Sequence, residues 1–260
     1  MDGRTKAVWS ALFVLGFGLS YLLPNRLPLG TPRLLPLGVW EQNLPLVPWT
    51  FLVYMSDYVL GAWTVWHVRR ERDFLELARV ATVTMVISAT VFYLFPTAYP
   101  RPPYPATGSA ALDALMRFLT ATDQPNCAFP SMYVAMTAAC VWGIRQSVSR
   151  WTFVAVVLWG VAIAVSTLTT KQHYAWDVAG GFFVFGVAVA VDRALDRRFG
   201  PRAWPSWLFV GGGGPASRTP LPETAGRVLP NGDRGASSES PAQRNPGSAR
   251  ASGAGRGRGR

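Results

Sequence analysis

The residues best suited to chemistry are a histidine and an aspartate four positions apart, His173 and Asp177, in the segment STLTTKQHYAWD. On a helix this spacing places the two side chains on one face, one turn apart. The carboxylate can then accept a hydrogen bond from one ring nitrogen and leave the other to act as nucleophile or base. An acid inside an apolar helix is costly and is usually functional in a membrane protein. We therefore predict that this pair forms a reaction centre.

Two further segments carry groups suited to binding phosphate. Arg101 lies in the proline-stiffened segment PTAYPRPP, and a guanidinium matches the shape of a phosphate. Lys171 adds a second cation near His173. In the segment NCAFPSMY, Pro130 suits the first turn of a helix, so we expect Ser131 and the free N–H groups of that turn to form an anion site. Together these groups predict phosphoryl transfer, in which positioning and charge neutralisation dominate.

Six apolar blocks must position these residues, and each is about as long as a bilayer is thick, which takes ~20 residues of helix. They cover approximately residues 7–23, 46–66, 78–95, 128–144, 151–170 and 174–191. The acids inside them are Asp57 and Asp177, and the blocks lack the regular polar face of a soluble helix. Charged residues make up 15% of the chain, against roughly 25% in soluble domains. The sequence predicts an all-α membrane helix bundle with about six transmembrane helices.

Basic residues outside the blocks sort to one side if the six helices alternate across the membrane. They are Arg4, Lys6, Arg69, Arg70, Arg72, Arg145, Arg150, Arg193, Arg197, Arg198 and Arg202. By the positive-inside rule this side and both termini are cytoplasmic. The connections 24–45, 96–127 and 168–173 then lie together on the extracytoplasmic face, with the candidate site. An alternative is that the first block is a signal peptide, but no small-residue cleavage site follows it.

The chain divides by composition into a membrane domain, residues 1–202, and a tail, residues 203–260. The tail is rich in Gly, Pro, Ser and Arg and nearly lacks large apolar residues from Gly211 onward, so we expect it to be disordered. The chain carries a formal charge of +11, and we interpret the tail as a basic cytoplasmic segment near anionic headgroups. Nucleic-acid binding is disfavoured because no recognition module accompanies it. Cys127 and Cys140 lack metal-ligand spacing with a histidine, and we predict no metal or other cofactor.

The three motifs resemble the signatures of a known family. Pro-Arg-Pro, Phe-Pro-Ser-x-x-Val-Ala and Ser-Thr-x5-His-Tyr-x2-Asp-Val-x2-Gly are similar to those of the type 2 phosphatidic acid phosphatase superfamily, over roughly residues 40–192. The closest resemblance is to the inositol phosphorylceramide synthase-like branch. It implies six helices and a metal-independent phosphohistidine mechanism on a lipid phosphate or diphosphate. In this mechanism His173 is the nucleophile and Asp177 orients it, while the phosphate ligands are Arg101, Ser131 and Ser166.

Three positions depart from the family pattern. Leu94 stands where the first motif has a lysine, and Thr167 stands where the third motif has an arginine, so Lys171 is the candidate replacement for either charge. Tyr133 stands where the family has the histidine that protonates the leaving group. A phenol with a pKa near ~10 is a poorer acid at neutral pH. Leaving groups that depart easily, such as a phosphate from a diphosphate, are therefore favoured over simple monoesters.

Two functions follow from these residues. The first is a lipid phosphatase or phosphotransferase, with Tyr133 among its catalytic residues. The second is a catalytically impaired relative that binds lipid phosphate or serves as a membrane scaffold. A transporter or channel is disfavoured because the polar residues gather at one face of the membrane. The sequence leaves open the lipid, the choice between water and an alcohol as acceptor, the oligomeric state and the role of Asp57.

Overall fold

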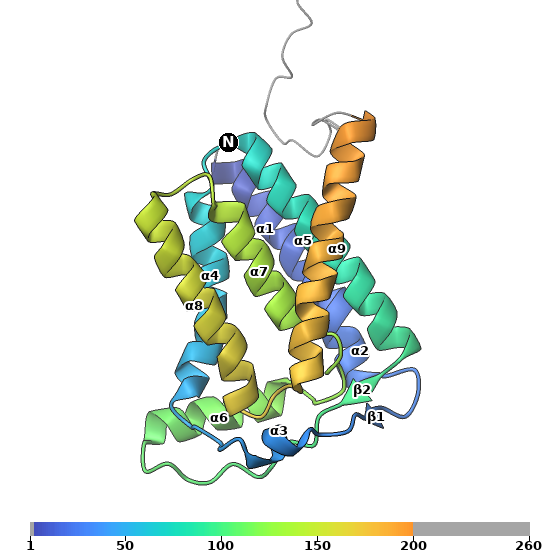
Figure 1. Ribbon diagram of the computed structural model, residues 1–260, viewed down its shortest axis with the longest axis vertical. Coiled ribbons are helices and arrows are strands. Elements are labelled where there is room, and N and C mark those ends of the chain that lie inside the picture. The colour runs from blue at the N-terminus through green and yellow to red at the C-terminus, as the bar shows by residue number, and fades with distance from the viewer. Residues whose placement is uncertain (1–2, 200–260) are drawn as a thin grey trace, which may run out of the picture. The chain divides into compact units, whose positions relative to one another are not determined.

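The computed structural model describes residues 3–199, which fold into a bundle of helices (Figure 1). The elements are α1 (Gly3–Phe17), the π-helix η1 (Gly18–Leu22), α2 (Leu23–Arg26), β1 (Arg33–Leu34), α3 (Val39–Asn43), α4 (Thr50–His67), α5 (Glu71–Leu94), β2 (Thr97–Ala98), α6 (Ala110–Thr122), α7 (Met132–Ile144), α8 (Arg150–Thr169) and α9 (Ala175–Phe199). The prediction of an all-α bundle is confirmed. The predicted tail, residues 203–260, lies outside the described residues.

Each of the six apolar blocks overlaps one long helix of this bundle. Within residues 3–199, four helical stretches are long and apolar enough to cross a membrane: Gly3–Arg26, Glu71–Leu94, Arg150–Thr169 and Ala175–Phe199. Large apolar side chains such as Leu15, Val161 and Phe183 point outward from them and are exposed. These helices therefore present apolar surface where a soluble helix would present charge.

The remaining two blocks form α4 and α7. Helix α4 carries Asp57 in its middle, and α7 has 13 residues, about 20 Å at ~1.5 Å per residue, which is less than the ~30 Å hydrocarbon core. Residues on all sides of α7 are buried, because it packs against α4, α5, α8 and α9. Figure 1 shows α7 between α8 and α9. Helix α7 is thus apolar all round because it is the centre of the bundle.

The fourth block does not begin as a helix at residue 128, contrary to the sequence prediction. Helix α7 starts at Met132, with Ser131 as its N-cap, so Pro130 precedes the helix and is not part of its first turn. The reason lies in the neighbouring chain segment. The N–H groups of Ala128 and Phe129 donate to the backbone oxygen and the hydroxyl of Thr97, at 3.0 and 2.7 Å. These bonds hold the segment against β2, so helical hydrogen bonding begins only after it.

The predicted connections meet at one end of the bundle. Strand β1 pairs in parallel with β2, with Arg33 opposite Thr97, and the N–H of Val47 donates to Thr169 at the end of α8. Figure 1 shows α3, α6, β1 and β2 at the end opposite the N-terminus. The segments 24–45, 96–127 and 168–173 therefore lie together, as the alternation of helices predicts.

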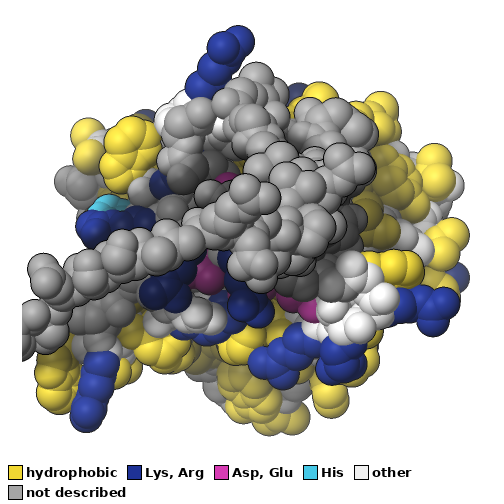
Figure 2. Space-filling view, turned by 90° about the horizontal axis from the view of Figure 1, so that it is seen from above, with side chains coloured by type: hydrophobic (Ala, Val, Ile, Leu, Met, Phe, Trp, Pro, Cys, Tyr) yellow, Lys and Arg dark blue, Asp and Glu magenta, His cyan; other side chains and the backbone are white. Residues whose placement is uncertain are grey.

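Charged side chains join the helices at the other end. Lys6 donates to the carbonyl oxygens of Trp66 and Val68, both at 2.9 Å, and Arg145 pairs with Glu76 at 2.7 Å. Figure 2, seen from above Figure 1, shows Lys and Arg side chains gathered around this end. The starts of α1 and α5, the turn between α7 and α8, and the end of α9 thus belong to one basic end.

Arg79 is a buried charge that the sequence reading did not single out, although it lies in the third block. Its side chain is 4% exposed and pairs with Asp192 and, at 2.8 Å, with Asp196 of α9. Because burying an unpaired charge is very costly, the ion pairs explain how an arginine is tolerated among apolar helices.

Candidate active site

His173 and Asp177 are in contact, but not by the helical geometry that their spacing predicts. Helix α9 begins at Ala175, so His173 precedes it. The Asp177 carboxylate folds back over the helix start, where its Oδ2 accepts from the N–H of Tyr174 at 2.8 Å and lies 3.2 Å from His173 Nδ1. A carboxylate in the first turn that satisfies a free backbone N–H is a common helix cap. The cap therefore brings the pair together.

The surroundings of the imidazole fix its protonation pattern. His173 Nδ1 lies 3.1 Å from the carbonyl oxygen of Ala128 as well as 3.2 Å from the Asp177 carboxylate. A carbonyl oxygen can only accept, so Nδ1 carries the proton and Nε2 of the neutral ring carries a lone pair. Within residues 3–199, Nε2 has no hydrogen-bond partner. The His173 side chain is 8% exposed and is held with the lone pair of Nε2 free.

Ser131 joins the second motif to the third. Its N–H donates to the carbonyl oxygen of Asp177 at 2.9 Å, and its buried hydroxyl accepts from the N–H of Val134 at 3.2 Å. The second contact is an N-cap of α7, which leaves the neighbouring N–H groups of that turn available. The start of α7 thus lies against the first turn of α9, beside His173.

Arg101 is held by Asp123, an acid that lies outside the three sequence motifs. Its Nη2 pairs with Asp123 Oδ2 at 2.6 Å, and its Nη1 donates to the Asp123 carbonyl oxygen at 2.5 Å. Burial disfavours the charged guanidinium, but the attraction of Asp123 outweighs burial and raises the pKa of Arg101. Asp123 follows α6, and its partner is far away along the chain, so sequence reasoning missed it.

Tyr104 connects the first motif to the third. Its hydroxyl accepts from Gln172 Nε2 at 2.5 Å and donates to the Thr170 carbonyl oxygen at 3.1 Å. Burial raises the pKa of Tyr104 to about 12, while the positive charge of Arg101 opposes that rise. The phenol is therefore protonated at neutral pH. It adds to the contact between the segment of Arg101 and the segment of His173, which also meet where the Tyr174 hydroxyl donates to the Ala98 carbonyl oxygen at 3.1 Å.

A comparison with protein-family models assigns the chain to a family. The family model of the PAP2 superfamily matches residues 23–191, well over half of the chain. The chain belongs to the PAP2 superfamily. A search of curated proteins found no match. Members of the superfamily are typically phosphatases, and together with the four apolar helices the match identifies an integral membrane protein. The matched region extends further toward the N-terminus than the predicted resemblance and contains every predicted site residue.

Two predicted phosphate ligands of this superfamily member are bound to other groups. Lys171 Nζ donates to the Glu41 carbonyl oxygen at 3.0 Å, and burial lowers the pKa of Lys171, opposed by the Glu41 charge. The Ser166 hydroxyl is buried and donates to the Ile163 carbonyl oxygen within α8 at 2.6 Å. The structure does not bring either side chain into contact with Arg101 or with the His173 imidazole.

Tyr133, at the position of the superfamily's acid histidine, is bound to α4. Its hydroxyl donates to the carbonyl oxygen of Tyr54, and the two rings stack with centroids 4.3 Å apart and planes 2° apart. One turn further along α7, the Thr137 hydroxyl lies 2.7 Å from Asp57 Oδ1. Asp57 thus pairs with a neighbouring helix, which gives this intramembrane acid a polar partner.

Glu41 is a second acid that the sequence reading missed. Its Oε1 accepts from the N–H of Ala175 at the start of α9 at 2.6 Å, and its Oε2 accepts from the N–H of Gly38 at 2.7 Å. The buried carboxylate therefore caps the helix that carries Asp177, from a segment more than a hundred residues away. A negative charge at a helix N-terminus is stabilising.

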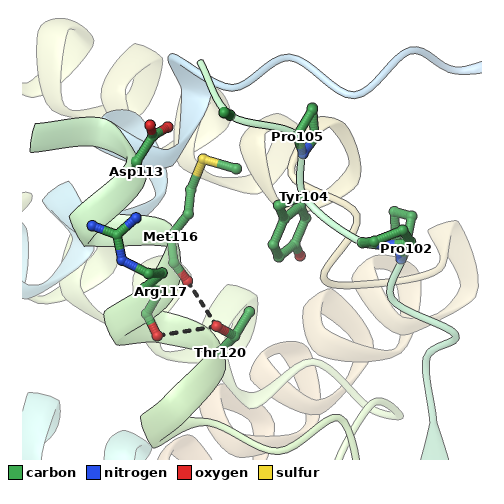
Figure 3. Close-up of a pocket in the computed structure, with 9 residues that line it drawn as sticks. Pro102, Tyr104, Pro105, Asp113, Met116, Arg117 and Thr120 are labelled. Atoms are coloured by element: carbon green, nitrogen blue, oxygen red, sulfur yellow. Dashed lines mark hydrogen bonds between the residues drawn. The ribbon is translucent and has the colours of Figure 1, made fainter. Parts of the chain in front are cut away.

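A pocket of about 370 Å³ is formed by the segment that follows Arg101 in the chain (Figure 3). Its lining consists of the proline-rich segment and one face of α6: Pro102, Pro103, Tyr104, Pro105, Ala106, Asp113, Met116, Arg117 and Thr120. Figure 3 shows Tyr104 between the prolines and α6, facing Met116 across the pocket. Because Tyr104 also touches Gln172, the pocket is next to the third motif. Among residues 3–199, His, Cys, Asp and Glu side chains form no group of three that could hold a metal ion.

Proposed function

We propose that the protein is a lipid phosphatase or phosphotransferase of the inositol phosphorylceramide synthase-like branch, which acts on a lipid phosphate or diphosphate through a phosphohistidine at His173. The observation that carries the proposal is the imidazole geometry. Nδ1 is fixed as the donor by Ala128 and Asp177, so the lone pair of Nε2 is free for attack.

In the proposed reaction, Nε2 of His173 attacks the substrate phosphorus, and the bond from phosphorus to the leaving oxygen breaks. The new P–N bond leaves a positive charge on the ring, which the adjacent Asp177 carboxylate stabilises. Water or an alcohol then attacks the phosphorus and releases its proton to solvent, the P–N bond breaks with its electron pair returning to Nε2, and the ring returns to its neutral form. Arg101 and the N–H groups at the start of α7 neutralise the phosphoryl charge.

We also propose the orientation of the protein in the membrane. The basic end of the bundle carries the starts of α1 and α5 and the end of α9, and the positive-inside rule assigns such an end to the cytoplasm. The motifs lie at the other end, so the site faces the extracytoplasmic side. A lipid phosphate there would present its headgroup to His173 while its chains stay in the bilayer.

One observation favours the second candidate function, a catalytically impaired lipid-phosphate binder or scaffold. The Tyr133 hydroxyl donates a hydrogen bond to a backbone carbonyl oxygen of α4, and a phenol is a weak acid at neutral pH. A leaving group that needs a proton would therefore depart slowly. A diphosphate, whose leaving phosphate needs no proton, escapes this limit and is the substrate that we expect to react fastest.

The test uses purified protein with a panel of lipid phosphates and diphosphates. We expect phosphate release by the wild type and by His67→Ala, and none by His173→Ala; His67 is the second histidine of the chain and serves as the matched control. Acid-labile, base-stable labelling of the wild type with a ³²P-labelled substrate would identify the phosphohistidine. The absence of turnover on every panel member would favour the impaired relative.

A further inference from the structure

Asp123, whose side chain is 13% exposed, pairs with the proposed phosphate-binding arginine, and no sequence motif contains it. We propose that Asp123 is a positioning residue, which holds one edge of the Arg101 guanidinium so that the other edge binds the substrate phosphate. The inference rests on the proposed function, because it assigns a role within the same site.

The atoms that Asp123 contacts define which edge is occupied. A guanidinium offers an end-on edge, formed by the two terminal nitrogens, and a side-on edge, formed by Nε–H and the outer hydrogen of Nη2. Asp123 takes the end-on edge, with its carbonyl oxygen on Nη1 and its carboxylate on Nη2. The side-on edge remains, and Nε is buried without a hydrogen-bond partner.

The unpaired Nε points to a ligand. The Arg101 side chain is 12% exposed, and a buried N–H group without an acceptor is rare and costly in a protein. A phosphate oxygen on Nε, with a second on Nη2, would satisfy both donors in the two-pronged geometry that guanidinium and phosphate share. Asp123 and a phosphate can therefore bind Arg101 at the same time, on different edges.

Asp123 itself is fixed from the N-terminal helices. The Tyr21 hydroxyl donates to its Oδ1 at 2.6 Å, so each carboxylate oxygen has its own partner. Asn25, which is fully buried, bonds both the N–H and the carbonyl oxygen of Gln124. The orientation of Arg101 is thus set by contacts from a distant part of the chain, since Tyr21 and Asp123 are 102 residues apart. Preorganised groups of this kind avoid reorganisation when the ligand binds.

The test measures binding of inorganic phosphate by ³¹P NMR, together with kcat and KM on the best substrate of the panel. We expect Asp123→Asn to weaken phosphate binding about tenfold and to raise KM, because Asn retains an acceptor for Tyr21 but loses the charge that holds Arg101. Glu71→Gln is the control, because it removes one negative charge from an exposed side chain at the start of α5, at the opposite end of the bundle.

A double-mutant cycle separates positioning from mere support of the fold. If Asp123 acts through Arg101, Asp123→Asn will change phosphate affinity by less than about twofold when Arg101 is already Ala. An equal loss in both backgrounds overturns the proposal, as does an unchanged affinity in Asp123→Asn alone. If Asp123→Asn fails to fold, Tyr21→Phe replaces it. We expect this variant to bind phosphate about threefold more weakly, and only when Arg101 is present. An unchanged phosphate affinity in Tyr21→Phe would also overturn the proposal.

The outcomes also distinguish this inference from the proposed function. If the wild type binds phosphate but turns over no lipid, the proposed catalysis is refuted. The effect of Asp123→Asn on phosphate binding then still tests the positioning role independently. If the wild type releases phosphate from a lipid and Asp123→Asn has the same phosphate affinity and KM, the proposed enzymatic function is supported and the positioning role of Asp123 is refuted.

Discussion

The N–H of Ser131 donates to the carbonyl oxygen of Asp177 at 2.9 Å, and this bond fixes the start of α7 against the first turn of α9. The bond requires the two helices to approach closely. Gly181 permits the approach, because a Cβ placed there would lie 2.6 Å from the Ser131 carbonyl oxygen. The site is therefore assembled by backbone contacts between helices as well as by side chains.

Gly181→Ala should damage the site. A Cβ would press on the backbone oxygen of Ser131 and lie 3.1 Å from Cβ of Val134, neither of which is a flexible chain end. We expect a loss of about 1–3 kcal/mol in unfolding free energy and at least tenfold lower turnover. Thermal unfolding in detergent and phosphate release would measure both. Gly186→Ala, on the same helix with nothing within 4 Å of its Cβ, should leave both unchanged; equal effects of the two variants would contradict the role of Gly181.

Asp177→Asn should slow formation of the phosphohistidine far more than it lowers stability. An amide can still accept from the Tyr174 N–H, but it cannot stabilise a positive imidazole as a carboxylate does. We expect the rate of phosphoenzyme formation to fall by about 10²-fold or more. Rapid-quench experiments with labelled substrate would measure this rate. Asp57→Asn, which changes the acid paired with Thr137, serves as the comparison and should change this rate little. A normal rate in Asp177→Asn would exclude Asp177 as the group that orients the histidine.

Substitutions at Tyr133 should separate an acid from a structural residue. Tyr133→Phe keeps the stack on Tyr54 and removes the bond to its carbonyl oxygen, at a cost of about 1 kcal/mol in stability. If the phenol is the acid, hydrolysis of lipid monoesters will fall while hydrolysis of diphosphates is retained. Tyr133→His should then raise monoester turnover. Equal effects on the two substrate classes would indicate that Tyr133 supports the fold alone.

Breaking the Arg79–Asp192 pair should destabilise the bundle without affecting the chemistry. Asp192 is 3% exposed, so Arg79→Ala leaves a buried charge without this partner, at a cost of about 3–5 kcal/mol in unfolding free energy. The double variant Arg79→Met with Asp192→Leu should recover much of that loss. Thermal unfolding would measure the stability, and KM on the lipid panel should stay constant in the variants that fold. If the double variant does not regain stability, the unpaired buried charge is not the cause of the loss in Arg79→Ala.

Tyr104 should contribute a stability that depends on pH. Its pKa is raised to about 12 in the folded protein from a usual value near 10, so its contribution is complete below pH ~10 and is lost as the pH rises through the folded value. We expect about 1 kcal/mol, because the partly exposed phenol is screened by solvent. The difference in unfolding temperature between wild type and Tyr104→Phe should shrink from pH ~9 to ~11.5. A difference that stays constant over this range would contradict the assignment.

Several parts of the candidate site were predictable because they are encoded locally. The spacing of His173 and Asp177 indicated their contact, and the apolar blocks indicated the helices that carry the site. The structure places His173 before α9, and a capping carboxylate, not a continuous helix, brings the two side chains together. The predicted place of Pro130 in the first turn of a helix was wrong, because contacts with Thr97 delay the start of α7.

The sequence by itself determined that the chain forms apolar helices, that one end of the bundle carries most of the basic clusters, and that the three motifs lie at the other end. These features depend on periodicity, block length and short spacings, which are properties of neighbouring residues. The tertiary structure decided that Asp123 holds Arg101 across 22 residues, that Tyr104 meets Gln172 across 68, and that Glu41 caps α9 across 134. Such pairs leave no local pattern, because each side chain acquires its partner only when the packed helices bring distant loops to the same end of the bundle.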